Sequence, residues 1–139
     1  MNFAEYKNKL SDYEEVLSVI GEYVSGLKSG NIDHVKKAFH KDAIMYGYDR
    51  DDLMSGSIDN LYKWLEKGKA DPNNKGGELR THIDVLDITP TTAVARVTLE
   101  YDFAGTDPGR TQYTTDYHSL IKVDGKWVVI AKLFHWYNY

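Results

Sequence analysis

Apolar residues recur at intervals of three and four near the start of this chain, which is the spacing that gives an α-helix one buried face. The first such run covers residues 13–27, with Asp12 before it as a helix cap and Gly30 after it as a helix end. Asn31 then predicts the start of a short second helix, whose apolar positions extend to Phe39.

The middle of the chain predicts one strand, one helix and two loops. Residues 43–48 (AIMYGY) favour a short strand, and the charged segment 49–56 favours a loop. A third helix is predicted between Ser57, which can cap its start, and Gly68, which can end it. Residues 68–77 (GKADPNNKGG) lack an apolar anchor and predict a mobile loop.

The last part of the chain is rich in β-branched and aromatic residues and predicts four long strands. These are residues 78–88, 91–103, 110–123 and 126–137. Asp124-Gly125 is typical of a two-residue type I′ hairpin turn, and short connections make neighbouring strands antiparallel. The sequence therefore predicts a single α+β domain over residues 1–139, in which three N-terminal helices cover one face of a curved antiparallel sheet.

The Asp124-Gly125 turn pairs Val123 with Lys126, and strict alternation then assigns every residue behind it to a face. One predicted face carries Thr114, Asp116, His118, Leu120, Trp127, Val129, Ala131, Leu133 and His135. The other carries Tyr113, Thr115, Tyr117, Ser119, Ile121, Val128, Ile130, Lys132, Phe134 and Trp136. Because both faces are substantially apolar, we expect helices to cover one and a second copy of the chain to cover the other, as a homodimer.

The same alternation makes a prediction for the two earlier strands. An even-length turn around Pro90 places His82 and Asp84 on the face of Val97 and Tyr101. If the loop Ala104–Gly109 is also even in length, one face of the sheet carries His82, Asp84, Tyr101, Asp116 and His118. If that loop is odd, the two strand pairs change phase and this cluster does not form.

Composition excludes several classes of function. The net charge is −4 without a basic stripe, which argues against nucleic acid, and no apolar run is long enough to span a membrane. The start of the chain does not resemble a signal peptide and cysteine is absent, so we expect a cytoplasmic location. Eleven Tyr and three Trp suit a partly wet pocket or an interface, although they can also simply fill a core.

Two segments carry a resemblance to a known family: the closing run KVDGKWVVIAKLFH, at 122–135, and the early run YVSGLKSGN, at 23–31. With the order of elements, they resemble the nuclear transport factor 2-like superfamily, in particular its putative lumazine-binding branch near the polyketide-cyclase-like and ketosteroid-isomerase-like proteins. The resemblance implies a cone-shaped fold with a pocket between helices and sheet, and frequent dimers through the outer sheet face. The superfamily contains isomerases, dehydratases, cyclases, ligand binders and scaffolds, so fold leaves the activity open.

The resemblance to ketosteroid-isomerase-like enzymes implies a carboxylate base with a tyrosine as oxyanion donor, parts that Asp116 and Tyr23 could play. From the residues themselves, Asp116 and His118 point the same way on a strand, and an aspartate beside a histidine can tune a general base. This makes Asp116 and His118 the candidate catalytic pair. The alternative is that they form a polar part of an interface.

The candidate ligand-binding residues are Tyr23, Tyr46, Tyr48, Trp64, His82, Tyr101 and Trp136. We expect the first strand's tyrosines and Trp64 to form an aromatic wall opposite the sheet, and Trp136 rather than His135 to face the helices. No spacing demands a metal, and no cofactor is expected. Three functions follow: a binding protein for a small apolar or aromatic ligand, an isomerase-, dehydratase- or cyclase-type enzyme, or a dimeric association module without a ligand.

Overall fold

The computed structural model describes residues 10–49, 51–70, 78–102 and 111–137. Its elements, in chain order, are α1 (Leu10–Ser29), α2 (Ile32–Lys36), β1 (Phe39–Asp49), β2 (Asp52–Ser57), α3 (Asp59–Ala70), β3 (Leu79–Ile88), β4 (Thr92–Asp102), β5 (Thr111–Val123) and β6 (Lys126–Tyr137). The predicted loop 104–109 and most of the predicted loop 68–77 lie outside the described residues, as do residues 1–9.

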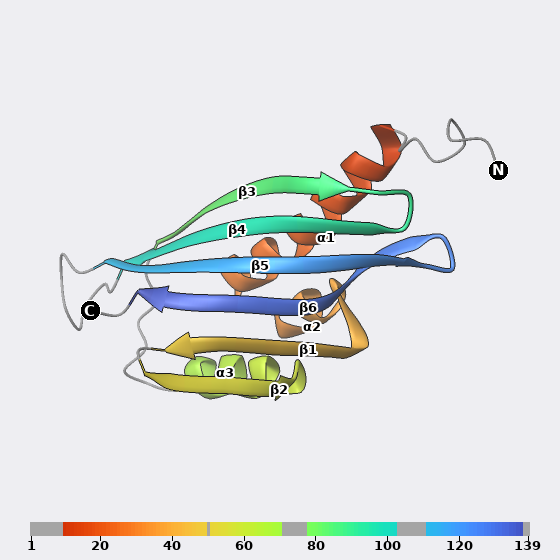
Figure 1. Cartoon of the computed structure of the whole chain (residues 1–139). Coiled ribbons are helices and arrows are strands. Elements are labelled where there is room, and N and C mark those ends of the chain that lie inside the picture. Colours follow the sequence, from red (N-terminus) through yellow and green to blue (C-terminus); the bar gives the residue numbers. More distant parts are fainter. Residues whose placement is uncertain (1–9, 50, 71–77, 103–110, 138–139) are drawn as a thin grey trace, which may run out of the picture.

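The six strands form one curved sheet in the order β2-β1-β6-β5-β4-β3, and the three helices lie on one of its faces (Figure 1). This is the α+β architecture that the sequence predicts. Neighbouring strands are antiparallel except for β1 and β6, which run parallel. A hairpin does not connect β1 with β6, so their relative direction is not fixed by a short turn.

The predicted helix ends are largely confirmed. Gly30 has a φ of +70° directly after α1, and the Asn31 side chain accepts a hydrogen bond from the His34 backbone N–H at the start of α2. The Ser57 hydroxyl likewise accepts from the backbone N–H of Asp59. Asp12, by contrast, lies inside α1, where its carboxylate accepts hydrogen bonds from Lys122 and Trp127 and so ties the helix to the sheet.

The prediction of a loop over 49–56 was wrong. Residues Asp52–Ser57 form β2, which pairs with β1 and occupies one edge of the sheet. Leu53 is exposed and most of its neighbours in the strand are polar or small, so β2 lacks the apolar run that marks a buried strand. Its backbone pairing with β1 stabilises it.

A β-bulge in β6 overturns the predicted faces of that strand. Leu120 pairs with Val129 and Ser119 with Ala131, so Ile130 is an extra residue without a direct partner. The Asp124-Gly125 turn forms as predicted, with positive φ at both residues. Beyond the bulge the phase reverses: Lys132, Phe134 and Trp136 join the helix-covered face of Asp116, and Ala131, Leu133 and His135 leave it.

A second bulge, at Leu86 in β3, has the same effect. Val85 pairs with Ala95 and Asp87 with Val94, and His82 therefore lies opposite Thr98 on the outer face, away from the helices. Between β4 and β5 the even alternative is confirmed, because Val97 pairs with Asp116. The predicted five-residue cluster is thus split: Tyr101, Asp116 and His118 share the inner face, whereas His82 and Asp84 do not.

The core lies between the helices and the inner sheet face, and it contains Val16, Ile20, Tyr23 and Val24 of α1. Helix α2 crosses α1 closely at Gly26, where an added Cβ would lie 2.6 Å from Cγ2 of Val35. In the same way β1 requires Gly47, because an added Cβ there would collide with the carbonyl oxygen and ring of Phe134. These two glycines let α2 and the ring of Phe134 close the core around the polar residues described next.

Candidate functional site

Four side chains with ionisable groups meet at the centre of the inner sheet face. Tyr23 comes from α1, Asp116 and His118 from β5, and Lys132 from β6. The Tyr23 hydroxyl donates a hydrogen bond of 2.8 Å to Oδ2 of Asp116. The same oxygen lies 3.6 Å from Nε2 of His118 and 3.9 Å from Nζ of Lys132. We call Tyr23, Asp116, His118 and Lys132 the polar cluster.

The polar cluster is buried and only partly satisfied. Asp116 and His118 are 0% exposed, and Lys132 is 5% exposed. Within the described part of the chain, Oδ1 of Asp116 and both ring nitrogens of His118 have no hydrogen-bond partner. Buried polar atoms are nearly always paired, so three unpaired ones beside each other call for an explanation and make the polar cluster the candidate site.

The charges of the cluster are set by burial and by the close contacts. Burial alone would raise the pKa of Asp116, but the Lys132 ammonium, His118 and the Tyr23 hydroxyl together hold this pKa below its ordinary value. Burial lowers the pKa of Lys132, and the charge of Asp116 offsets only part of this effect. Asp116 is therefore a carboxylate near neutral pH, and Lys132 loses its proton more readily than an exposed lysine.

Burial also lowers the pKa of His118, although Asp116 opposes the shift, so the imidazole is neutral near pH ~7. A neutral ring carries no charge, so the charge of Lys132 and the hydrogen bond from Tyr23 are the main interactions that keep Asp116 ionised. Burial and the neighbouring carboxylate raise the pKa of Tyr23 well above its ordinary value. The cluster thus combines a carboxylate, a neutral imidazole, a phenol and a lysine amine.

Aromatic rings extend from the cluster toward the surface. Nζ of Lys132 lies 4.5 Å from the centre of the Phe134 ring, and the Phe134 and Trp136 rings are 6.4 Å apart. Trp136 meets Trp64 of α3 edge to face, with 5.2 Å between ring centres. Trp64 is about half exposed, so this row of rings leads from solvent to the buried cluster. Trp136 faces the helices as predicted.

Three predicted ligand-binding residues lie on the opposite face of the sheet. Tyr46 and Tyr48 pair across β1 and β6 with Leu133 and His135, and both tyrosines are half exposed on the outer face. The expected aromatic wall opposite the sheet was therefore wrong for them, because they belong to the sheet itself. His82 contacts Asp84 on this outer face, where its side chain is 72% exposed.

Lys132 is the member of the cluster that the sequence prediction missed. Strict alternation placed it opposite to Asp116, and the bulge at Ile130 brings it back. One signal was available: a single lysine stands in the otherwise apolar segment WVVIAKLF at 127–134. A charged residue inside such a strand is costly unless it is paired or functional.

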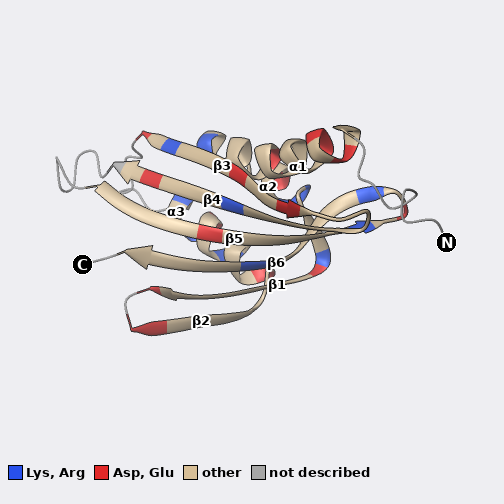
Figure 2. Cartoon of the chain, turned by 45° about the horizontal axis from the view of Figure 1, so that its top comes forward, with Lys and Arg blue, Asp and Glu red and all other residues tan. Residues whose placement is uncertain are grey.

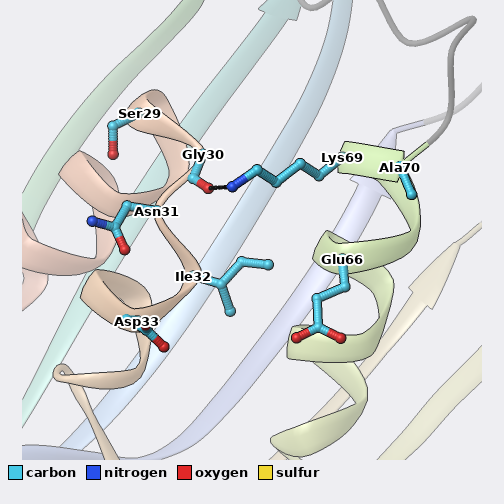
Figure 3. Close-up of a pocket in the computed structure, with 8 residues that line it drawn as sticks. All are labelled: Ser29, Gly30, Asn31, Ile32, Asp33, Glu66, Lys69 and Ala70. Carbon is cyan, nitrogen blue, oxygen red and sulfur yellow. Dashed lines mark hydrogen bonds between the residues drawn. The ribbon is translucent and has the colours of Figure 1, made fainter.

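A surface groove of about 600 Å³ lies elsewhere, between α3 and the junction of α1 with α2. Figure 3 shows Glu66 and Lys69 of α3 facing this junction, where the Lys69 amine donates to the carbonyl of Gly30. None of the predicted site residues lines the groove. Its walls are exposed and carry no buried ionisable group, so the polar cluster is the stronger candidate for chemistry.

Charges of both signs are interspersed over the helices and strands (Figure 2). In the ranges that the structure describes, no group of three or more His, Cys, Asp or Glu residues is arranged to hold a metal ion. The described helices also include none that is long and apolar enough to cross a membrane.

Comparison with known proteins adds a family to this geometry. Residues 11–135 match the family described as putative lumazine-binding. The chain belongs to this family. A relative by sequence is the aldolase FrzH of a Cladobotryum species. It is 35% identical to this chain over 127 residues, which cover 91% of this chain and 93% of the aldolase.

Solved structures place this chain in the nuclear transport factor 2-like superfamily. A nuclear transport factor 2-like protein of unknown function from Shewanella baltica has a TM-score of 0.78 at 26% identity, and the match covers 96% of this chain and 99% of that protein. A ketosteroid isomerase-like protein from Erwinia carotovora has a TM-score of 0.71 at 13% identity, covering 94% and 100% of the two chains. The second likeness is one of fold alone.

Proposed function

We propose that this protein is an enzyme that removes a proton from the carbon beside a carbonyl group of a small organic substrate, with His118 as the base. The observation that carries the proposal is the buried pair of Asp116 and His118, whose three unpaired atoms lie on the helix-covered face. A neutral imidazole can accept a proton, and a carboxylate 3.6 Å away stabilises the imidazolium that results.

The other members of the cluster suit the negative charge that this step creates. Removal of the proton leaves an enolate, whose charge lies largely on the carbonyl oxygen. Lys132 supplies the positive charge of the site, and Tyr23 holds the carboxylate in place through its 2.8 Å hydrogen bond. The enolate carbon can then be reprotonated, expel a β-hydroxyl group or attack a second carbonyl.

The last of these outcomes is an aldol reaction, and the 35% identical relative is named an aldolase. We therefore favour carbon–carbon bond formation or cleavage among the reactions open to an enolate. The row of Phe134, Trp136 and Trp64 suits a substrate with a flat or apolar body.

Exchange of α-protons in heavy water tests the proposal without knowledge of the natural substrate. A panel of small ketones and aldehydes is incubated with the protein, and loss of the α-proton signal is followed by NMR. Asp116→Asn should lower the exchange rate by about 100-fold or more, because the imidazolium loses its counter-charge. Equal rates in the wild type and this variant would refute the proposal, as would a panel in which no compound exchanges.

The outer sheet face offers a matched control. Asp84 also contacts a histidine and a cation there, with His82 and Arg96 both at 3.0 Å, but it is solvent-accessible. Asp84→Asn should therefore leave the exchange rate unchanged. A loss of exchange in this variant would indicate a general effect of the substitution on the fold.

Ligand binding without turnover is a second candidate, favoured by the family description and by the edge-to-face pair of Trp64 and Trp136. Lumazine itself is the first ligand to test, by quenching of tryptophan fluorescence. Saturable quenching that is lost in Trp64→Ala, in a protein that exchanges no α-proton, would support binding alone.

We also propose that a homodimer forms through the outer sheet face. Tyr46, Leu133 and Tyr117 lie side by side across β1, β6 and β5, and each is between 43% and 50% exposed. Such a contiguous apolar surface favours association. Leu133→Lys should convert the dimer to a monomer in sedimentation analysis, whereas Leu86→Lys, at the exposed bulge of β3, should not. A wild-type monomer would exclude the interface.

A further inference from the structure

Lys132 differs from the other lysines of the described chain. It is the buried one, whereas the others are exposed or partly exposed. The bulge at Ile130 is what turns its side chain toward the helices, and its cross-strand partner on β5 is His118. An amine is therefore held inside the domain, directly beside the proposed base.

The contacts of Lys132 leave its nitrogen without a hydrogen bond. Among the residues that the structure describes, Nζ approaches Oδ2 of Asp116 at 3.9 Å and the ring of Phe134 at 4.5 Å, and neither is a hydrogen-bonded contact. An ammonium carries three donors, and burying them unpaired is costly. This environment raises the fraction of Lys132 that is present as the neutral amine, the nucleophilic form of lysine, above that of an exposed lysine.

We propose that Lys132 is the covalent nucleophile of this site and that its amine condenses with the carbonyl group of an aldehyde or ketone substrate to form an imine. The inference rests on the proposed function and names the substrate class and the residue that holds the substrate. It assigns to Lys132 a second role besides that of a positive charge.

The atoms balance without any further reagent. The amine attacks the carbonyl carbon, a C–N bond forms, and the carbonyl oxygen takes up a proton as a hydroxyl group. Loss of this hydroxyl as water gives the imine, which is protonated and withdraws electrons from the neighbouring C–H bond. His118 removes that proton and leaves an enamine, whose carbon attacks a second carbonyl and forms a C–C bond. The new alkoxide oxygen takes the proton from His118, and addition of water to the resulting iminium then releases the product and restores the amine.

Two neighbours suit the proton transfers of these steps. Asp116 shares its Oδ2 between Tyr23 and Lys132, and its other oxygen has no partner in the described chain. His118 has two unpaired ring nitrogens. The Asp116 carboxylate can take the proton that the amine loses on attack and return it to the leaving hydroxyl, and His118 can accept the proton from carbon.

Reductive trapping tests the inference directly. The wild-type protein is incubated near neutral pH with acetaldehyde and sodium cyanoborohydride, which converts an imine to an ethylated lysine, and modified peptides are identified by mass spectrometry. Lys132 should be ethylated about tenfold or more faster than exposed Lys126, because burial increases the neutral fraction of the amine. Ethylation of Lys132 at the rate of Lys126 or below would overturn the inference.

A pair of variants separates the inference from the proposed function. Lys132→Arg keeps a positive charge but cannot form an imine, and Lys126→Arg is its exposed control. We expect α-proton exchange to be lost in the first variant and retained in the second. If exchange persists in Lys132→Arg, the imine is excluded and the proposed function stands. If Lys132 is ethylated preferentially but no compound exchanges its α-proton, the assignment of Lys132 as nucleophile is supported and that of His118 as base is refuted.

Discussion

The buried pair of Asp116 and Lys132 should contribute strongly to stability, and a double-mutant cycle can measure its contribution. The cycle compares Asp116→Asn, Lys132→Met and the double variant with the wild type. The charged atoms are 3.9 Å apart. At an effective dielectric constant of about 20, two unit charges at that distance attract by ~4 kcal/mol.

The single variants should lose less than the full attraction, because each also removes a buried charge that is costly to desolvate. We expect each to lower the free energy of unfolding by about 2–4 kcal/mol, and the double variant to lower it by no more than either one. The coupling energy between the two residues is then at least about 2–4 kcal/mol. Urea unfolding near neutral pH, followed by tryptophan fluorescence, provides all four values.

The dependence on pH has a definite sign. Because the pKa of Asp116 is lowered in the folded state, its contribution is present above the pKa of an unfolded aspartate, about 4, and is lost as pH falls through the folded value. The partly exposed pair of Asp84 and Arg96 is closer, at 3.0 Å, yet contact with solvent should make its coupling markedly smaller. A coupling for the buried pair below about 1 kcal/mol would refute the assignment of a strong, poorly solvated interaction.

Three further outcomes are expected. Tyr23→Phe removes a hydrogen bond to a buried carboxylate and should lower the free energy of unfolding by about 1.5–3 kcal/mol, whereas Tyr13→Phe, on the exposed part of α1, should change it by less than about 0.5 kcal/mol in the same urea titration. Gly26→Ala forces a Cβ to within 2.6 Å of Val35 and should lower the free energy of unfolding by about 1–3 kcal/mol. Gly21→Ala, whose Cβ meets no neighbouring side chain within 4 Å, should be neutral or stabilising by up to about 1 kcal/mol. Equal effects at the two glycines would exclude close packing of α1 and α2. The rate of α-proton exchange should fall in acid with a midpoint below about 6.5, the ordinary pKa of histidine, because burial lowers the pKa of His118. A midpoint above that pH would contradict a buried, neutral base.

Much of the fold could be predicted because local patterns agree with the final structure. The spacing of apolar residues located α1, and Gly30 and Asn31 marked the point where α1 gives way to α2. Asp124-Gly125 fixed the hairpin of β5 and β6. The pair of Asp116 and His118 could be found because an inner strand face tolerates polar residues only at a cost, and both are indeed buried there.

What could not be predicted depends on interactions between distant segments. No local pattern distinguishes Ile130 or Leu86 from an ordinary strand residue, so the two bulges were missed, and with them the positions of Lys132 and His82. The edge strand β2 was missed because backbone pairing with β1, rather than its own side chains, holds it. Bulges and edges are properties of strand pairs, and a single strand does not encode them.

The bulge at Ile130 makes the two surfaces of β6 interdependent. Beyond this residue, Lys132 is sent inward and Leu133 outward, so one inserted position decides the contents of the interior and of the exposed sheet at once. If Ile130 were instead paired as an ordinary strand residue, the two sets would exchange, placing a leucine beside Asp116 and a lysine among the outer tyrosines. Loss of the bulge with the residue retained would therefore remove the amine from the interior and place a charge in the proposed subunit contact at the same time.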